Sequence, residues 1–428
     1  MSKYVFTNCF ILDGTEDMKP TKGSVYVDGE KIIKVTTDES IDPSFEVIDL
    51  HEQYLMPGLI NMHVHLAGNG KPQKKQRDNE KLVKQVFATA IGRYIARKLV
   101  EKYAQIELMS GVTTIRTVGG LRALDSQTQD KINQGKLIGP RILCSNTAVS
   151  VKGGHMAGSV AKACDTIDEA LNFIDQLKDE NVDLIKLMIT GGVMDAKEKG
   201  VPGQLKMDPK MVKACCEKAH ALGYIVSAHV ESTEGVKVAL ENGVDSIEHG
   251  AVLDEECIKL FKEKNAFLIC TISPGIPYAL FDRSIANTSE VEKYNGQVVL
   301  NGFIEGSKAA LENNIPVGLG NDVGCPWISQ YDFYRELVYF HKYVGVSTAF
   351  ALHTATLVNA KLAGVDSITG SIEEGKFADM IVTNKNPLDD LNHLRNINMV
   401  IRNGQIIRNP KVKRNTYVDS YLDPYCQN

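Results

Sequence analysis

Hydrophobic residues in the middle of the chain recur in short runs, and longer amphipathic stretches separate these runs. Eight of the short runs have the length of a buried strand. They cover residues 59–63, 113–118, 141–145, 183–188, 224–229, 245–249, 267–271 and 316–321. Amphipathic segments such as 82–103 and 211–221 predict helices, the second of which ends before Gly223. Eight alternating strands and helices predict a (β/α)8 TIM-type barrel, with a doubly wound parallel sheet as the alternative.

The two ends of the chain have a different, β-rich pattern. The first 56 residues contain short β-branched runs and a turn signal at Asp28–Gly29. Similar runs return at 378–384 and 399–409, where Asn403–Gly404 marks another turn. We therefore expect an α/β protein in which both termini form one small β-sandwich domain around the barrel. The predicted boundaries are 1–56 and 371–428 for the β-sandwich with a C-terminal tail, and 57–370 for the barrel.

Residues that can bind a metal stand at the carboxyl ends of the predicted barrel strands, where barrels place their functional groups. They are His63, His65, Lys186, His229, His249 and Asp322. Side chains two apart on a strand share a face, so His63 and His65 can bind one divalent ion together with Asp322 from the last strand. His229 and His249, from adjacent strands, can bind a second ion. Imidazole and carboxylate ligands suit zinc, so we expect two divalent metal ions, with zinc as the metal.

Lys186 differs from the other five residues because its ammonium form would be costly beside two dications. Burial and nearby positive charge would lower the pKa of Lys186 and favour the free amine. Two interpretations stay open from the residues alone: a lysine that reaches the mouth of the barrel, or a chemically modified lysine.

Composition narrows the function classes further. The 428 residues carry 48 basic and 53 acidic side chains, a net charge of −5 that gives no reason to expect a nucleic-acid partner. Nine cysteines without a C-x-x-C pair suggest a reduced, cytoplasmic chain, and no signal segment or membrane-spanning run is recognisable. We expect a small-molecule substrate, no membrane association and a homo-oligomer. A basic run after the first barrel strand is either a solvated loop or a site for a substrate carboxylate: Lys71, Lys74, Lys75 and Arg77.

The strand-end segments MPGLINMHVHL, IKLM, SAHV, SIEHG and GNDVG together resemble the metal-dependent amidohydrolase superfamily, over about residues 1–410. The resemblance implies that carbon dioxide carboxylates Lys186 and that this carbamate bridges two metals. One metal would be held by His63, His65 and Asp322, and the other by His229 and His249. A hydroxide shared by the metals would attack the scissile carbonyl, with Asp322 as general base and then general acid.

Within this superfamily the chain looks most like the imidazolonepropionase-related, prolidase-like zinc dipeptidases and carboxypeptidases. These enzymes release a C-terminal amino acid from dipeptides or N-acylated amino acids. The segment 150–158 resembles a Gly-Gly-His stretch of that subgroup, which implies that His155 helps to polarise the substrate carbonyl; a loop histidine without this role is the alternative. Some members carry a tyrosine just after the fifth-strand histidine, whereas this chain has Val230, Glu231 and Ser232.

Two other functions compete with this interpretation. A cyclic amide hydrolase or deaminase such as imidazolonepropionase, or another small amide or carbamate hydrolase, would share the fold, but the single-metal members generally do not depend on a bridging lysine. A non-catalytic relative is the alternative from another class, and such relatives usually lose ligands, while all six positions are filled here. We expect the choice of leaving amino acid to depend on loops 190–204, 271–290 and 323–333.

Overall fold

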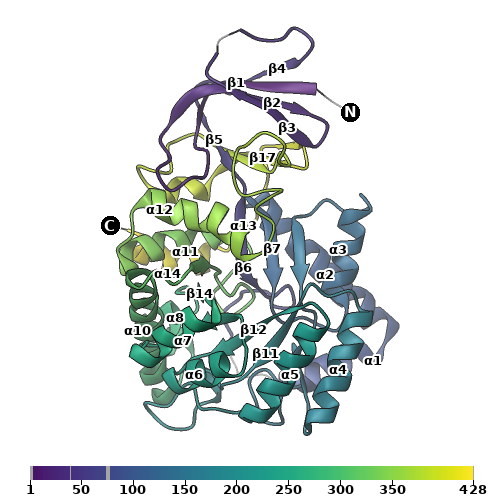
Figure 1. Cartoon of the computed structure of the whole chain (residues 1–428), viewed down its shortest axis with the longest axis vertical. Coiled ribbons are helices and arrows are strands. Elements are labelled where there is room, and N and C mark those ends of the chain that lie inside the picture. The colour runs from purple at the N-terminus through teal and green to yellow at the C-terminus, as the bar shows by residue number, and fades with distance from the viewer. Residues whose placement is uncertain (1–2, 39, 74–77, 428) are drawn as a thin grey trace.

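The computed structural model describes residues 3–38, 40–73 and 78–427 of the chain. A β-rich layer, built largely from purple and yellow segments at the two chain ends, lies above a barrel whose helices surround its strands (Figure 1). The functional side chains come from the barrel strands.

The barrel is a closed ring of eight strands. In chain order they are β6 (Leu59–Val64), β7 (Val112–Thr117), β8 (Arg141–Cys144), β11 (Leu184–Met188), β12 (Ile225–Val230), β13 (Ser246–His249), β14 (Phe267–Cys270) and β15 (Val317–Leu319). Parallel pairing forms two runs of neighbouring strands. The first run is β6–β7–β8, and the second is β11–β12–β13–β14–β15. The Asp183 N–H donates to Cys144 O at 2.7 Å, and the His65 N–H donates to Val323 O at 2.9 Å, so both seams are linked. The eight predicted strands are confirmed, although the last is shorter than expected.

Helices follow most barrel strands and cover the outside of the ring. They include α3 (Leu124–Asn133), α4 (Ile167–Asp179), α5 (Pro209–Ala221), α6 (Thr233–Glu241), α7 (Glu255–Lys264) and α10 (Glu290–Glu312). The sequence explains their limits: Asp208 caps α5 by accepting from the Lys210 N–H at 2.7 Å, Pro209 opens the helix, and Gly223 takes φ +85° just beyond its end.

The prediction of a single helix over residues 82–103 was wrong, because two helices cover this segment. The structure divides it into α1 (Asn79–Ala88) and α2 (Ala90–Met109). Thr89 between them adopts φ −116° and ψ 151°, and its Oγ1 accepts from the Gly92 N–H at 3.0 Å. A local threonine cap therefore interrupts an apolar pattern that is continuous in the sequence.

Strands from both ends of the chain form one eight-stranded sheet. Its order is β18–β17–β16–β5–β1–β2–β3, with β4 (Glu46–Asp49) paired to β1. The other strands are β1 (Lys3–Ile11), β2 (Thr21–Asp28), β3 (Lys31–Thr36), β5 (Tyr54–Pro57), β16 (Met380–Thr383), β17 (Ile397–Arg402) and β18 (Gln405–Arg408). Antiparallel pairing of β5 with β16 joins the two ends. Asn403 and Gly404, at φ +48° and +72°, form the predicted turn between β17 and β18. The two-layer sandwich and the domain boundaries stay predictions.

Two additional short strands position one loop of the site. β9 (Ala148–Ser150) pairs with β11 through Val149 and Leu187, and β10 (Ala161–Ala163) pairs with β9. They enclose residues 151–160, the segment that contains His155.

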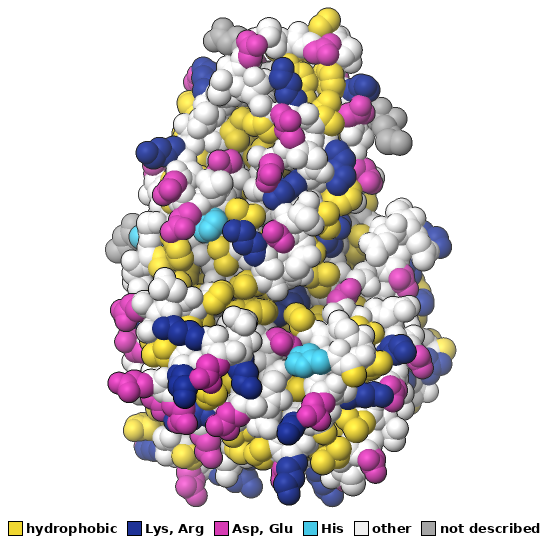
Figure 2. Space-filling model, viewed as in Figure 1, with side chains coloured by type: hydrophobic (Ala, Val, Ile, Leu, Met, Phe, Trp, Pro, Cys, Tyr) yellow, Lys and Arg dark blue, Asp and Glu magenta, His cyan; other side chains and the backbone are white. Residues whose placement is uncertain are grey.

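Acidic and basic side chains are interspersed on the face shown in Figure 2, in agreement with the small net charge. Within the described ranges, no helix combines the length and apolar character that crossing a bilayer requires.

Candidate metal centre and active site

Three buried side chains form the centre of the site. His63, His249 and Asp322 each offer a ligand atom, and these atoms lie within 4.8 Å of one another. His65 lies beside this group, with its Nε2 at 3.2 Å from Asp322 Oδ1, while the His63 Nε2 is 3.5 Å from the same oxygen. His229 completes the set, because its ring centroid is 4.7 Å from that of His249. The structure thus brings together the five predicted histidine and aspartate ligands.

Unusual backbone conformations orient two of these ligands. His249 ends β13 with φ +71°, and Asp322 follows β15 with φ +54°; both values lie in the left-handed region, which non-glycine residues rarely adopt. The imidazole of His249 is held in place by the Thr271 hydroxyl, 2.7 Å from Nδ1, and by the ring of Phe303. The strand ends therefore bend so that these side chains join the cluster.

Lys186, the sixth predicted ligand, lies buried on β11 inside the barrel. Its Nζ has no hydrogen-bond partner. Burial lowers the pKa of Lys186 to about 8, and the opposing effects of Glu248 and Asp322 do not restore it. An unpartnered amine buried in this position is costly as it stands.

The cluster has the protonation states that metal binding requires. Burial, aided by the charge of Lys186, lowers the pKa of His63 to about 4, and burial also holds the pKa values of His229 and His249 well below the ordinary value for histidine. Burial alone would raise the pKa of Asp322, but the hydrogen bond from His65 holds it well below its usual range. Neutral imidazoles and an ionised carboxylate are therefore present at neutral pH.

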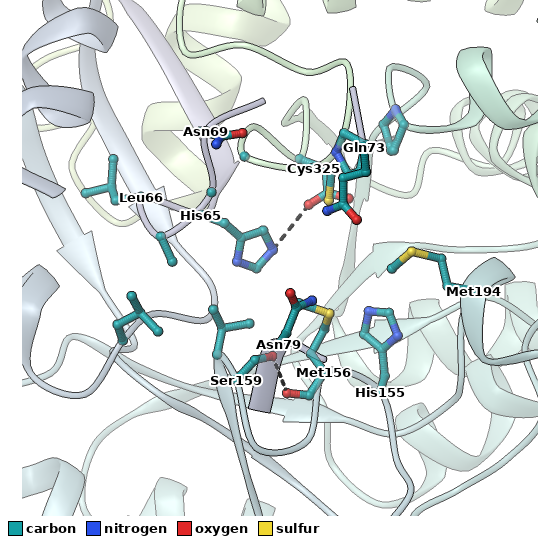
Figure 3. Close-up of a pocket in the computed structure, with 18 of the residues that line it drawn as sticks. His65, Leu66, Asn69, Gln73, Asn79, His155, Met156, Ser159, Met194 and Cys325 are labelled. Atoms are coloured by element: carbon teal, nitrogen blue, oxygen red, sulfur yellow. Dashed lines mark hydrogen bonds and ion pairs between the residues drawn. The ribbon is translucent and has the colours of Figure 1, made fainter. Parts of the chain in front are cut away.

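His155 reaches the cluster from its loop. Its ring stacks on that of His229, with centroids 4.0 Å apart and an interplanar angle of 4°. The Nδ1 atom lies 2.6 Å from Asp195 Oδ2, which also accepts from the Gly192 N–H at 2.9 Å. In Figure 3, His155 and His65 approach the cavity from different segments of the chain.

Sequence reasoning missed the carboxylate that supports His63. Glu248 Oε2 accepts from His63 Nδ1 at 2.7 Å, and Glu248 Oε1 accepts from Arg116 Nη2 at 2.6 Å and from the hydroxyls of Ser227 and Ser246 at 2.9 and 2.6 Å. This network fixes the His63 ring with Nε2 toward Asp322. Ser246 and Glu248 alternate with the apolar Ile247, so the sequence places both polar side chains on one face of the strand. The interpretation of this strand rested on the adjacent His249 alone.

A cavity of about 470 Å³ opens onto the cluster. Each of the three loops expected to govern specificity contributes to it, through Val193, Tyr278 and Cys325 among others. Lys71 also lines the cavity, whereas Lys74, Lys75 and Arg77 of the basic run lie outside the described residues.

The missing tyrosine after β12 has a candidate replacement. Tyr278, from α8 (Gly275–Leu280) after β14, lines the cavity, and burial raises its pKa, so its hydroxyl stays neutral and can donate a hydrogen bond. Nothing in the sequence pattern distinguished this tyrosine from the 14 others in the chain.

The profile of the Amidohydrolase family matches residues 54–407, which is most of the chain. The chain belongs to the amidohydrolase family. The protein is therefore a hydrolase that acts on carbon–nitrogen bonds, as the strand-end residues suggested.

Three relatives illustrate the family. A crystal structure from Bifidobacterium longum, provisionally assigned as a prolidase, is 34% identical, with a TM-score of 0.86 over 99% of this chain and 98% of that one. A Xaa-Pro dipeptidase, solved with methionine bound in its active site, is 26% identical, with a TM-score of 0.81 over 95% of this chain and all of that chain. Ochratoxinase from Aspergillus niger is 26% identical over 408 residues, 88% of this chain and 80% of that protein.

Proposed function

We propose that this protein is a binuclear zinc amidohydrolase that cleaves the amide bond of a dipeptide or an N-acyl amino acid and releases the C-terminal amino acid. The observation that carries the proposal is the buried group of His63, His249 and Asp322 beside an unpartnered Lys186 amine. The likeness to a prolidase and to a Xaa-Pro dipeptidase with a bound amino acid supports this substrate class.

The residues present fit two metal ions. His63, His65 and Asp322 would hold one ion, and His229 and His249 the other. Lys186 Nζ is buried without a hydrogen bond, as expected for an atom that awaits a partner. When bound, the ions would supply Lewis-acid polarisation of the scissile carbonyl and lower the pKa of a water molecule.

Carboxylation of Lys186 would complete this site. The neutral amine would attack the carbon of carbon dioxide, a C–N bond would form as one C–O π bond opens, and the nitrogen would release one proton to water, which leaves a carbamate anion. The carbamate would give this position a negative charge and two oxygens that could serve as metal ligands. The unpartnered amine and its low pKa support this step.

Proton transfer would be carried out by Asp322 and assisted by His155. The ionised Asp322 would accept a proton from the attacking water and deliver it to the leaving nitrogen. Asp195 holds the His155 ring through Nδ1, which leaves Nε2 as the ring atom that can meet the carbonyl oxygen of a substrate. The hydroxyl of Tyr278 is the second candidate donor.

Lys71 would attract the carboxylate of the substrate. Lys71 belongs to the predicted basic run, and its side chain lines the cavity. Lys71→Glu should raise the Michaelis constant for substrates with a free C-terminal carboxylate more than it changes kcat.

The proposal is tested by a panel of glycyl dipeptides and N-acetyl amino acids that together present small, branched, aromatic, acidic, basic and proline leaving residues. Metal-depleted and zinc-loaded protein are compared, and free amino acid is detected by mass spectrometry. We expect amino acid release by the zinc-loaded protein and not by the depleted protein. Lactones and cyclic imides serve as controls. Ring opening of a cyclic amide without amino acid release, together with about one metal per chain, would instead favour the imidazolonepropionase-like alternative.

A further inference from the structure

Glu231 is a carboxylate in the cavity that the mechanism above does not use. It lies two residues beyond the metal-ligand candidate His229, just after β12, and it lines the cavity. Its Oε2 is buried and has no hydrogen-bond partner. The charged groups that face it are the acids Asp195 and Asp322, and no lysine or arginine of the described ranges forms an ion pair with it.

The other two acids in this region already have partners. Asp195 is engaged by His155 and by the Gly192 N–H, and Asp322 is engaged by the histidines of the metal centre. Glu231 is thus the carboxylate of this part of the cavity with an oxygen available to a ligand.

The backbone of Glu231 is firmly placed. Its N–H donates to Thr190 Oγ1 at 3.1 Å, and a Cβ on Gly203 would lie only 2.2 Å from the Glu231 carbonyl oxygen. Loop 190–204 therefore packs directly against this residue, so that its carboxylate projects from a fixed position.

Gly192 lies close to both Glu231 and His155. A Cβ on Gly192 would be 3.1 Å from His155 Cε1 and 3.4 Å from Glu231 Oε2. Gly192 has φ −123° and ψ −174°, values that any residue can adopt, so its backbone conformation does not require glycine. A side chain at this position would instead crowd both His155 and Glu231.

This spacing suits one particular feature of a dipeptide. The α-amino nitrogen lies two bonds, each of about 1.5 Å, from the carbonyl carbon of the scissile bond. A group that binds the amine must therefore lie near the group that polarises the carbonyl. Glu231 and His155 satisfy this condition.

We propose that Glu231 binds the free α-ammonium group of a dipeptide substrate, which makes the enzyme a dipeptidase rather than an N-acyl amino acid hydrolase. This inference rests on the proposed function and selects between its two substrate classes. An ammonium ion in the cavity would form a charge-assisted hydrogen bond with Glu231. An N-acyl substrate offers no cation at this position and would leave Glu231 Oε2 without a partner, which disfavours its binding relative to a dipeptide.

Matched substrates test the inference. Glycyl-Xaa and N-acetyl-Xaa contain the same leaving amino acid and the same scissile bond, and they differ in the amino group of the acyl part. Wild-type enzyme should favour the glycyl member by at least about tenfold in kcat/KM. Glu231→Gln should lower kcat/KM for the glycyl member by about tenfold or more and leave the acetyl member within about twofold. Glu231→Asp, which keeps the charge, should retain part of the preference.

Controls separate this role from a structural one. Glu234→Gln makes the same chemical change at an exposed position in the first turn of α6 and should leave both rates unchanged. The metal content and thermal midpoint of Glu231→Gln should equal those of the wild type.

An equal fall for both substrates in Glu231→Gln, or loss of metal from that variant, would overturn the inference. Wild-type enzyme that cleaves both substrates equally well would overturn this inference alone and leave the proposed function standing. Failure to cleave any pair would overturn the proposed function as well.

Discussion

A single carboxylate, Asp322, is placed to serve both metal binding and proton transfer. Its Oδ1 faces the Nε2 atoms of His63 and His65, and its backbone, at φ +54°, donates from N–H to His63 O at 3.0 Å. Because the histidines keep its pKa low, Asp322 starts the reaction as a base.

Asp322→Asn should lower kcat by roughly 10²–10⁴-fold, the usual contribution of a general acid or base, with a much smaller change in the Michaelis constant. Steady-state kinetics with the best substrate of the panel will measure both constants. Asp168→Asn, an exposed change in the first turn of α4, is the matched control. A variant that binds substrate poorly but turns it over normally would contradict the proton-transfer role.

Lys186 predicts how the metal-free protein recovers activity as pH changes. Its pKa of about 8 means that the ammonium form, which cannot attack carbon dioxide, dominates below this pH. At constant dissolved carbon dioxide, the rate of reconstitution with zinc should therefore rise by about tenfold per pH unit below pH 8 and level off above it. The pKa of His63, about 4, is too low to contribute in this range.

The time course of activity after addition of zinc and bicarbonate checks this expectation. A recovery rate that depends neither on pH nor on bicarbonate would contradict carboxylation of Lys186.

The residues of the cluster could be predicted because each stands at a strand end, where period-two alternation and barrel topology fix its direction. Glu248 and Asp195 could not be predicted with the same ease. Glu248 acts through His63 across the barrel interior, and Asp195 reaches His155 from a loop whose path does not follow from spacing.

At the scale of elements, the close contact between β15 and β6 positions the metal centre. A Cβ on Gly320, which follows β15, would lie 2.4 Å from His63 Cβ and 2.5 Å from His63 N. No side chain fits there, so glycine allows Asp322 to approach His63.

Gly320→Ala should force the two strands apart, reduce the metal content of the folded protein and lower the free energy of unfolding by about 1–3 kcal/mol. Denaturant unfolding and metal analysis will measure the two effects. Gly23→Ala is the matched control, because its Cβ would meet Thr36 O at 2.7 Å in the terminal sheet. This control should destabilise the protein and leave its metal content unchanged. Full metal content in folded Gly320→Ala would contradict the positioning argument.

Helices and strands could be predicted where the hydrophobic pattern alone determines their type and length. The buried strands β6, β11 and β12 agree with the predicted ranges to within one residue. The break at Thr89 was not predicted, because a single side-chain cap outweighs a continuous apolar pattern there.

At the scale of the whole molecule, strands from the N-terminal and C-terminal parts of the chain form one sheet that lies beside the barrel (Figure 1). The similar β texture at both ends made this pairing predictable, while the strand order required the structure. The homo-oligomer expected from the sequence stays a prediction, which light scattering coupled to size-exclusion chromatography will test.

Native mass spectrometry of the intact protein, purified with zinc and bicarbonate, tests the central claim most directly, since one spectrum reports the metal ions and the carbamate together. We predict the mass of the chain plus two zinc ions and one carbon dioxide, and loss of the carbon dioxide and of one zinc ion in Lys186→Ala. A wild-type mass with a single metal and no carbon dioxide, or a Lys186→Ala protein that retains both metals, would contradict a binuclear site bridged by Lys186.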